Sequence, residues 1–359
     1  MAIKVLGMIG VTPSGKGATM SVIKGSISPE YIRDFSRTHE KAGFDMVLVG
    51  YTASSAEGFN VALYAAMQTE RLAFLIAHRP GFVAPTLAAR KVATFDVLTG
   101  GRLALHIITG MSDAEQQSEG DFAPKSERYR RASEYLDVFR RTLTSEAPFD
   151  YDGEFYHLKK GWSDVRPLQK PYPPIFFGGS SDGALDMGAR HCDVYAIYAE
   201  PLADTQKRIA DFRQRAAAFG RTPRFNISVR PIIADTEDAA WDKARKILEG
   251  VKARTDLRNL PQSRSAERLL SVAARGELHD ERLWMPIATA TAAQGNSSCL
   301  VGTPEQVANA ILKYYQLGVQ SVLVRGFDPY NDTIEYGREL IPRIKAGALA
   351  IDGAAAAAE

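Results

Sequence analysis

Short apolar runs alternate with amphipathic segments along almost the whole chain. Runs with the length and residue types of buried strands lie at residues 3–11, 44–51, 72–77, 103–109, 175–177, 193–198, 225–234 and 319–325. Helical patterns follow these runs, and Ser, Thr, Pro and Gly mark where the helices start and stop. Eight strands, each followed by a helical segment, predict an α/β fold of the (β/α)8 TIM-barrel type.

Two connections in this pattern are too long to be plain loops. The first, residues 110–170, contains a predicted helix at 126–143 and a β-like patch at 149–158. The second, residues 252–298, is rich in Arg, Ser and Ala, and we expect it to be a mobile lid over the barrel mouth. We predict one domain over residues 1–345 and a disordered tail over the alanine-rich residues 346–359.

The composition narrows the class of protein. With 45% hydrophobic and 24% charged residues it is typical of globular proteins, and a net charge of +2 gives no strong attraction to nucleic acid or membranes. No apolar run approaches the ~20 residues of a membrane-spanning helix, and the N-terminus lacks signal-peptide features. Two cysteines do not make a disulfide framework. We expect a cytoplasmic enzyme without nucleic-acid or membrane partners.

The stretch at residues 171–195 is the most informative one. An apolar run ends at Gly178 and Gly179, and Ser180, Ser181 and Asp182 precede a helical pattern. A helix N-terminus behind two glycines offers free N–H groups to an anion, and two hydroxyls add donors. The stretch predicts a phosphate-binding turn; an ordinary capped helix after a tight turn is the alternative.

Other polar and aromatic side chains fall at the ends of the predicted strands, where a TIM barrel carries its active site. No H-x-x-x-H pair or carboxylate cluster occurs among them, so no metal site is expected, and no G-x-S-x-G motif indicates a serine hydrolase. By elimination, a cofactor carries the chemistry. These candidate residues are Ser54, Ser55, His78, His106, Thr109, Gly110, Tyr198, Arg230, Arg325 and Phe327.

Arg230 is the candidate for binding an anionic substrate group. Because side chains alternate along a strand, Asn226, Ser228 and Arg230 share one face, which we expect to point into the barrel. A guanidinium holds an oxyanion through two parallel hydrogen bonds. The alternative is a structural ion pair with a barrel carboxylate.

These features together resemble the bacterial-luciferase-like, flavin-dependent monooxygenases. The nearest branch is that of the alkanesulfonate and dimethylsulfone monooxygenases, and the matching segments are residues 78–110, 126–141, 167–184 and 335–342. The resemblance implies reduced FMN (FMNH2), delivered by a separate NAD(P)H:flavin reductase, with O2 as co-substrate. It also implies a homodimer or a homotetramer, paired through the second and third helices.

The resemblance further implies roles for single residues. It places the FMN phosphate at Gly179, Ser180, Ser181 and Tyr129. It places His106 beside the flavin ring, with Thr109 and Gly110 along the ring edge.

The substrate side departs from the alkanesulfonate pattern. Ser54 or Ser55 stands where that branch has Cys, Tyr198 where it has Trp, and Phe327 follows the eighth strand where it has Tyr-x-His. Arg230 is retained, and Arg325 is a second possible charge. We therefore expect a monooxygenase that cleaves a carbon–heteroatom bond, with a small organosulfur compound as substrate and with His78, Tyr198 and Phe327 shaping the pocket. The alternatives are C–N cleavage in a heterocycle, an F420-dependent oxidoreductase, and a non-catalytic flavin-binding protein.

Overall fold

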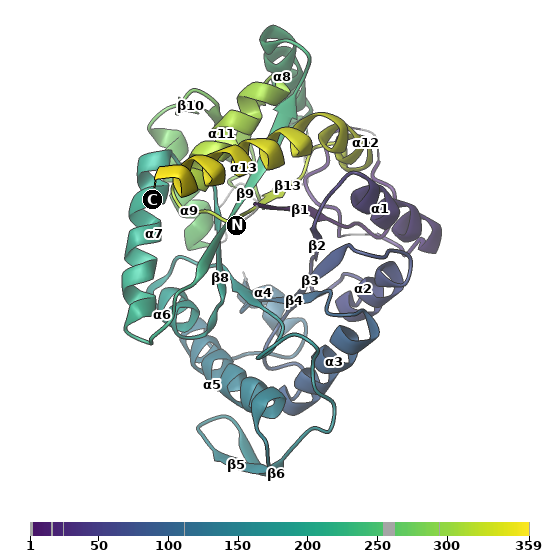
Figure 1. The fold of residues 1–359 in the computed structure, drawn as a ribbon, viewed down its shortest axis with the longest axis vertical. Coiled ribbons are helices and arrows are strands. Elements are labelled where there is room, and N and C mark those ends of the chain that lie inside the picture. The colour runs from purple at the N-terminus through teal and green to yellow at the C-terminus, as the bar shows by residue number, and fades with distance from the viewer. Residues whose placement is uncertain are drawn as a thin grey trace.

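The computed structural model describes residues 3–358, except residues 16, 24, 111, 254–262 and 294. Eight parallel strands of the described chain close into a barrel with helices around its outside, which confirms the predicted fold (Figure 1). Closure comes from β9, which pairs in parallel with both β8 and β13. The barrel strands, in order around the wall, are β1 (Lys4–Met8), β2 (Met46–Val49), β3 (Ala73–His78), β4 (Leu103–Ile107), β7 (Ile175–Phe177), β8 (Val194–Tyr198), β9 (Arg224–Ile233) and β13 (Ser321–Val324).

Most helices that cover the barrel start with a residue that favours a helix N-terminus. Ser28, Thr236 and Thr303 accept hydrogen bonds from the first turns of α1, α8 and α11, and Pro occupies the first turn of α1, α3 and α11. The covering helices are α1 (Pro29–Lys41), α2 (Gly58–Ala66), α3 (Pro85–Leu98), α5 (Lys125–Thr144), α6 (Asp182–His191), α7 (Leu202–Ala217), α8 (Glu237–Lys252), α11 (Pro304–Gln316) and α13 (Ile341–Ala358).

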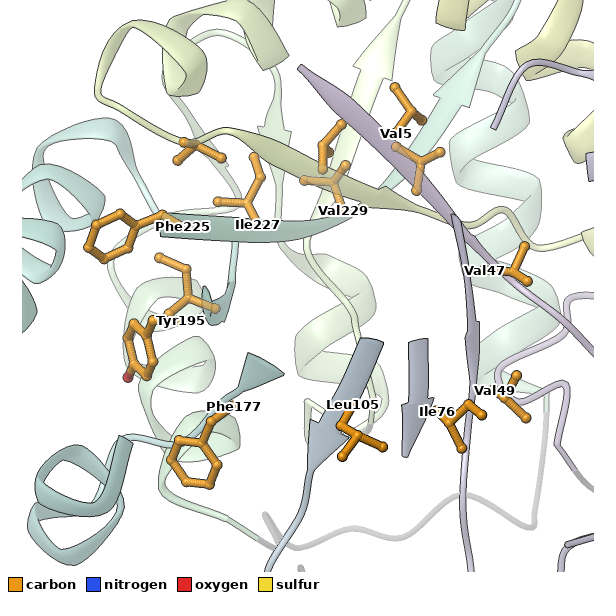
Figure 2. Packing of buried hydrophobic residues seen from close by; sticks show 14 of the residues in the cluster. Val5, Val47, Val49, Ile76, Leu105, Phe177, Tyr195, Phe225, Ile227 and Val229 are labelled. Carbon is orange, nitrogen blue, oxygen red and sulfur yellow. The ribbon is translucent and has the colours of Figure 1, made fainter. Parts of the chain in front are cut away.

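Strand alternation divides the core into two layers. Outward side chains such as Val5, Ile76 and Phe225 pack against the helices in one large cluster (Figure 2). Inward side chains, among them Leu6 and Leu323, form a smaller cluster inside the barrel. The inside of the barrel is therefore filled by side chains, as in other TIM barrels.

Both long insertions contain secondary structure. The first holds α4 (Asp113–Gln117), α5 and the hairpin β5 (Phe149–Asp152)–β6 (His157–Gly161). The second holds α9 (Arg264–Ala274), β10 (Leu278–His279), β11 (Leu283–Trp284) and α10 (Pro286–Ala290). A strand that was not predicted, β12 (Cys299–Gly302), follows the second insertion and pairs in parallel with the C-terminal part of β9. Residues 254–262 of the predicted lid lie outside the described residues.

The C-terminal segment differs from the expectation. Residues 346–358 were expected to be disordered, but they continue α13, which follows α12 (Pro329–Glu335) and a π-helical turn (Tyr336–Leu340). Alanine has the highest intrinsic helix propensity, so an alanine run extends a helix that already packs on α11 through its first turns. Among the described helices, none is long and apolar enough to cross a bilayer.

Candidate active site

A cavity of about 310 Å³ opens at the C-terminal ends of the barrel strands. Its lining combines the apolar side chains of Leu48, Leu75, Ile108 and Leu323 with hydroxyl, amide and charged groups. Such a mixture suits a flat aromatic ligand with polar groups at its ends.

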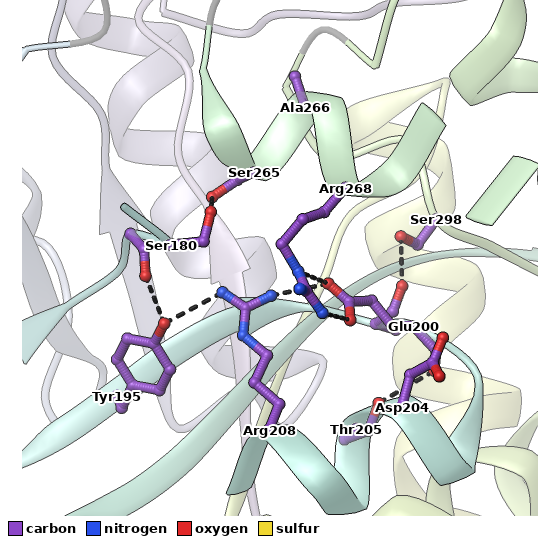
Figure 3. Close-up of polar contacts among 12 residues, drawn as sticks. Ser180, Tyr195, Glu200, Asp204, Thr205, Arg208, Ser265, Ala266, Arg268 and Ser298 are labelled. Carbon is purple, nitrogen blue, oxygen red and sulfur yellow. Dashed lines mark hydrogen bonds and ion pairs between the residues drawn. The ribbon is translucent and has the colours of Figure 1, made fainter. Parts of the chain in front are cut away.

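One end of the cavity is the turn between β7 and α6. Gly179 is required there, because a Cβ at this position would lie 2.7 Å from the Cβ of Ala184. Ser181 precedes α6 but its side chain makes no capping bond; its hydroxyl donates to the hydroxyl of Tyr129 at 3.2 Å instead. The Ser180 hydroxyl pairs with that of Ser265 at 3.1 Å (Figure 3). The start of α6 therefore faces the cavity with hydroxyls grouped around it.

His106, on β4, also lines the cavity. Burial lowers its pKa to about 4, so the imidazole is neutral at pH 7. Its Nδ1 atom is buried and has no hydrogen-bond partner among the described residues. A buried polar atom without a partner is costly, so this atom marks where a polar ligand group would be stabilised.

The structure brings eight of the predicted site residues to this one cavity. All seven residues predicted to bind the cofactor line it, and so does one of those predicted to be catalytic. They are His106, Thr109, Gly110, Tyr129, Gly179, Ser180, Ser181 and Tyr198.

His78, Ser54 and Ser55 are not part of the cavity wall. The imidazole of His78 points away from the barrel axis and contacts the hydroxyl of Tyr135 on α5 at 2.8 Å. Burial lowers its pKa to about 4. Ser55 bonds to the backbone of Thr52 within its own turn, and Ser54 is exposed. The structure therefore does not bring these three residues to the cavity with the other predicted site residues.

Arg230 is also placed outside the cavity wall. Its guanidinium donates four hydrogen bonds to backbone oxygens, from Nε to Asn296 (2.6 Å), from Nη1 to Thr19 (3.1 Å) and Gly326 (2.9 Å), and from Nη2 to Met20 (2.9 Å). The residue is 1% exposed. Burial, reinforced by Arg325, lowers its pKa well below the usual value. Arg230 thus holds together three loops, and its described hydrogen bonds go to backbone oxygens rather than to the barrel carboxylate that was the alternative.

Phe327 belongs to the same structural cluster. Its ring is 3% exposed and lies under the Arg230 guanidinium, 4.5 Å from the carbon atom to the ring centre. This cation–π contact adds to the stabilisation of the buried charge. Phe327 therefore supports Arg230 and does not shape the cavity.

Arg325 is in a different situation. Its Nη1 donates to the sulfur of Met8 at 3.2 Å, which is a weak acceptor, and its buried Nε has no partner among the described residues. The side chain is partly exposed and interacts electrostatically with Tyr198, which lines the cavity. Arg325 does not line the cavity either; together with Arg230 it lines a small neighbouring pocket. Of the two strand-end arginines, Arg325 is the one with a buried donor, Nε, that has no partner among the described residues.

Comparison with known proteins gives the family of this chain. The sequence pattern of the family "Luciferase-like monooxygenase" matches residues 5–321. The chain belongs to this family. As a luciferase-like monooxygenase it is similar to EDTA monooxygenase (EmoA) from Chelativorans sp. BNC1, with 16% identity, a TM-score of 0.78, and 96% of this chain and 94% of that chain covered.

Two further solved structures show how widely the fold is used. Riboflavin lyase (RcaE), solved with modified FMN and riboflavin, matches with 16% identity and a TM-score of 0.76, covering 95% of this chain and 91% of the other. An F420-dependent secondary alcohol dehydrogenase, solved with an F420–acetone adduct, matches with 15% identity and a TM-score of 0.69, and the match covers 96% of this chain and 99% of that chain. At such identities the likeness shows the fold and does not decide the cofactor.

Several cavity residues of this luciferase-like monooxygenase were not predicted. Arg208 comes from the middle of α7, Lys125 starts α5, and Ser263, Arg264 and Ser265 open α9. Helical periodicity alone does not distinguish Arg208 from its neighbours on a charged helix.

Proposed function

We propose that this protein is an FMNH2- and O2-dependent monooxygenase of a two-component system, supplied by a separate NAD(P)H:flavin reductase. The observation that carries the proposal is the cavity, with a glycine–serine turn at one end and the neutral His106 in the wall. It occurs in a chain that belongs to the luciferase-like monooxygenase family. Reduced flavin would supply the electrons for the reaction with O2.

The residues present fit an FMN molecule. The uncapped start of α6 and the hydroxyls of Ser180, Ser181 and Tyr129 would hold the phosphate. The unpartnered Nδ1 of His106 would meet a polar edge of the ring, and Thr109 and Gly110 would line that edge. The apolar wall would cover the ring faces and keep water from the reacting atoms.

Substrate binding is assigned to the mouth of the cavity. The phenol of Tyr198 stays neutral, because burial raises its pKa, and so it is a hydrogen-bond donor at pH 7. Arg325 lines the small neighbouring pocket and interacts electrostatically with Tyr198, and it would attract an anionic or strongly polar group. We propose a small organosulfur or related compound as substrate, with oxidation leading to cleavage of a carbon–heteroatom bond.

The test is aerobic turnover with a flavin reductase against a panel of sulfonates, sulfones and N-heterocycles. Sulfite release and mass spectrometry would score the products. Sulfite from one sulfur compound supports C–S cleavage, and a dealkylated or ring-opened amine supports the alternative of C–N cleavage. Tight binding of F420 but not of FMN to the purified protein would overturn the flavin proposal in favour of a hydride-transfer enzyme.

A further inference from the structure

The first turn of α9 lies against the phosphate end of the cavity. Ser263, Arg264 and Ser265 all line it, and the Ser265 hydroxyl is 3.1 Å from that of Ser180 (Figure 3). The two serines come from segments 85 residues apart in the sequence. Each hydroxyl of such a pair has a rotating proton, so both can turn from each other to donate to an anion placed beside them in the cavity.

One buried carboxylate fastens α9 to this position. Arg268, which shares a helix face with Ser265, donates to Glu200 through Nε at 3.0 Å and through Nη2 at 2.6 Å. The Glu200 side chain is only 2% exposed, and the hydrogen bond to it raises the pKa of Arg268. Two parallel hydrogen bonds to a buried carboxylate fix both the distance of α9 from Glu200 and the rotation of α9 about its axis.

The same carboxylate connects α9 to the glycine turn. Glu200 also accepts from Nη1 of Arg208 at 2.7 Å, and Nη2 of Arg208 donates to the hydroxyl of Tyr195 at 3.0 Å. That hydroxyl in turn donates to the carbonyl oxygen of Gly179 (Figure 3). An unbroken chain of hydrogen bonds therefore runs from α9 through Glu200 to the turn that carries Ser180.

The charges in this chain favour an anion. Arg208 lines the cavity and shares Glu200, its one carboxylate partner among the described residues, with Arg268, so the cluster of two guanidiniums and Glu200 keeps one net positive charge. Lys125 adds a second cation to the cavity wall. A phosphate monoester carries about −1.5 to −2 charges at pH 7, which complements this end of the cavity.

We propose that Ser265 of α9 binds the phosphate of the cofactor together with Ser180, and that Glu200 and Arg268 are the positioning residues that hold it there. This inference rests on the proposed function and adds α9 to its cofactor site. It predicts that the preference for a phosphorylated flavin over the same flavin without phosphate depends on the Glu200–Arg268 pair, which itself touches no ligand.

The experiment measures the dissociation constants of oxidised FMN and of riboflavin by fluorescence quenching. It compares the wild type, Ser265→Ala, Arg268→Gln and the control Arg275→Gln. Arg275 also ties the end of α9 to α7, through Asp204, but it lies at the far end of the helix and is exposed. Because a hydrogen bond to a charged group is lost, we expect Ser265→Ala and Arg268→Gln to weaken FMN binding about tenfold or more while riboflavin binding stays within about twofold. Arg275→Gln should leave both constants unchanged.

The outcomes separate this inference from the proposed function. If the wild type prefers FMN and both variants keep that preference, the role of α9 is refuted and the FMN site stands. If Arg268→Gln weakens FMN and riboflavin equally, the pair only stabilises the fold, and the positioning role is refuted. If the wild type binds riboflavin as well as FMN, or binds neither, the proposed phosphate site fails together with the inference.

Discussion

Replacing Arg230 by lysine separates a structural role from a substrate-binding role. The guanidinium serves four backbone oxygens that lie around it, from Thr19, Met20, Asn296 and Gly326. A lysine ammonium donates from a single point and cannot reproduce the planar fork. We expect at least two of these buried oxygens to lose their donor, at ~1–3 kcal/mol each.

The magnitude can be converted into a melting temperature. The ammonium keeps the positive charge and the remaining hydrogen bonds, so we expect a net destabilisation of about 2–4 kcal/mol. For 359 residues the unfolding entropy is about 0.75 kcal/mol per kelvin, which gives a decrease in Tm of roughly 3–5 K. FMN affinity and turnover below the transition should remain near the wild-type values.

The assay is thermal unfolding followed by circular dichroism, with reductase-coupled turnover measured on the same samples. Arg325→Lys is the matched control for stability, because Arg325 also lies at a strand end but its one described side-chain hydrogen bond goes to a thioether sulfur. We expect the control to change Tm by less than about 1 K. An Arg230→Lys protein with wild-type Tm and lost turnover would refute the reasoning and return Arg230 to the substrate site.

Three further predictions follow from the described contacts. Ser180→Ala combined with Ser181→Ala should weaken FMN binding at least about tenfold, and unchanged affinity would move the phosphate elsewhere. The free energy of unfolding should decrease as the pH is lowered from about 6.5 to 5, because the unfolded chain takes up protons that the folded chain does not. Each histidine that is buried in the neutral form contributes up to ~1.4 kcal/mol per pH unit to this decrease. Those with a lowered pKa are His39, His78, His106 and His191. A urea midpoint that is constant over this range would contradict the burial of neutral imidazoles. The proposed homodimer or homotetramer should use α2 and α3, where Met67 is 63% and Leu98 is 58% exposed, so Met67→Glu with Leu98→Glu should give monomers by light scattering. A wild-type protein that is itself monomeric at micromolar concentration would rule out this assembly.

Sequence patterns predicted those parts of the fold and the site that are formed by residues close together in the sequence. The barrel strands follow from short apolar runs, and the phosphate turn follows from Gly178, Gly179 and two serines directly before a helix. Tyr129, His106 and Thr109 came from the family resemblance, and all three line the cavity.

The misplaced residues have physical explanations of two kinds. His78 lies two positions after Ile76 on β3, so strand alternation sends its side chain outward, and the same rule that was used for Arg230 would have shown this. For Arg230 the direction was inward as expected, but its partners are backbone oxygens from three distant loops. Every residue carries a backbone oxygen, so no sequence pattern marks such a partner. The contribution of α9 depends in the same way on a long-range pair, Arg268 with Glu200.

The central claim is that this protein uses reduced flavin and O2 to oxidise its substrate. The most direct measurement is turnover under ¹⁸O₂ with FMN, NADH and a flavin reductase, using the substrate found in the panel, with mass spectrometry of the product. The account predicts one ¹⁸O atom in the product and no product when FMN or the reductase is left out. Product formation without O2, or with reduced F420 in place of reduced FMN, would contradict it.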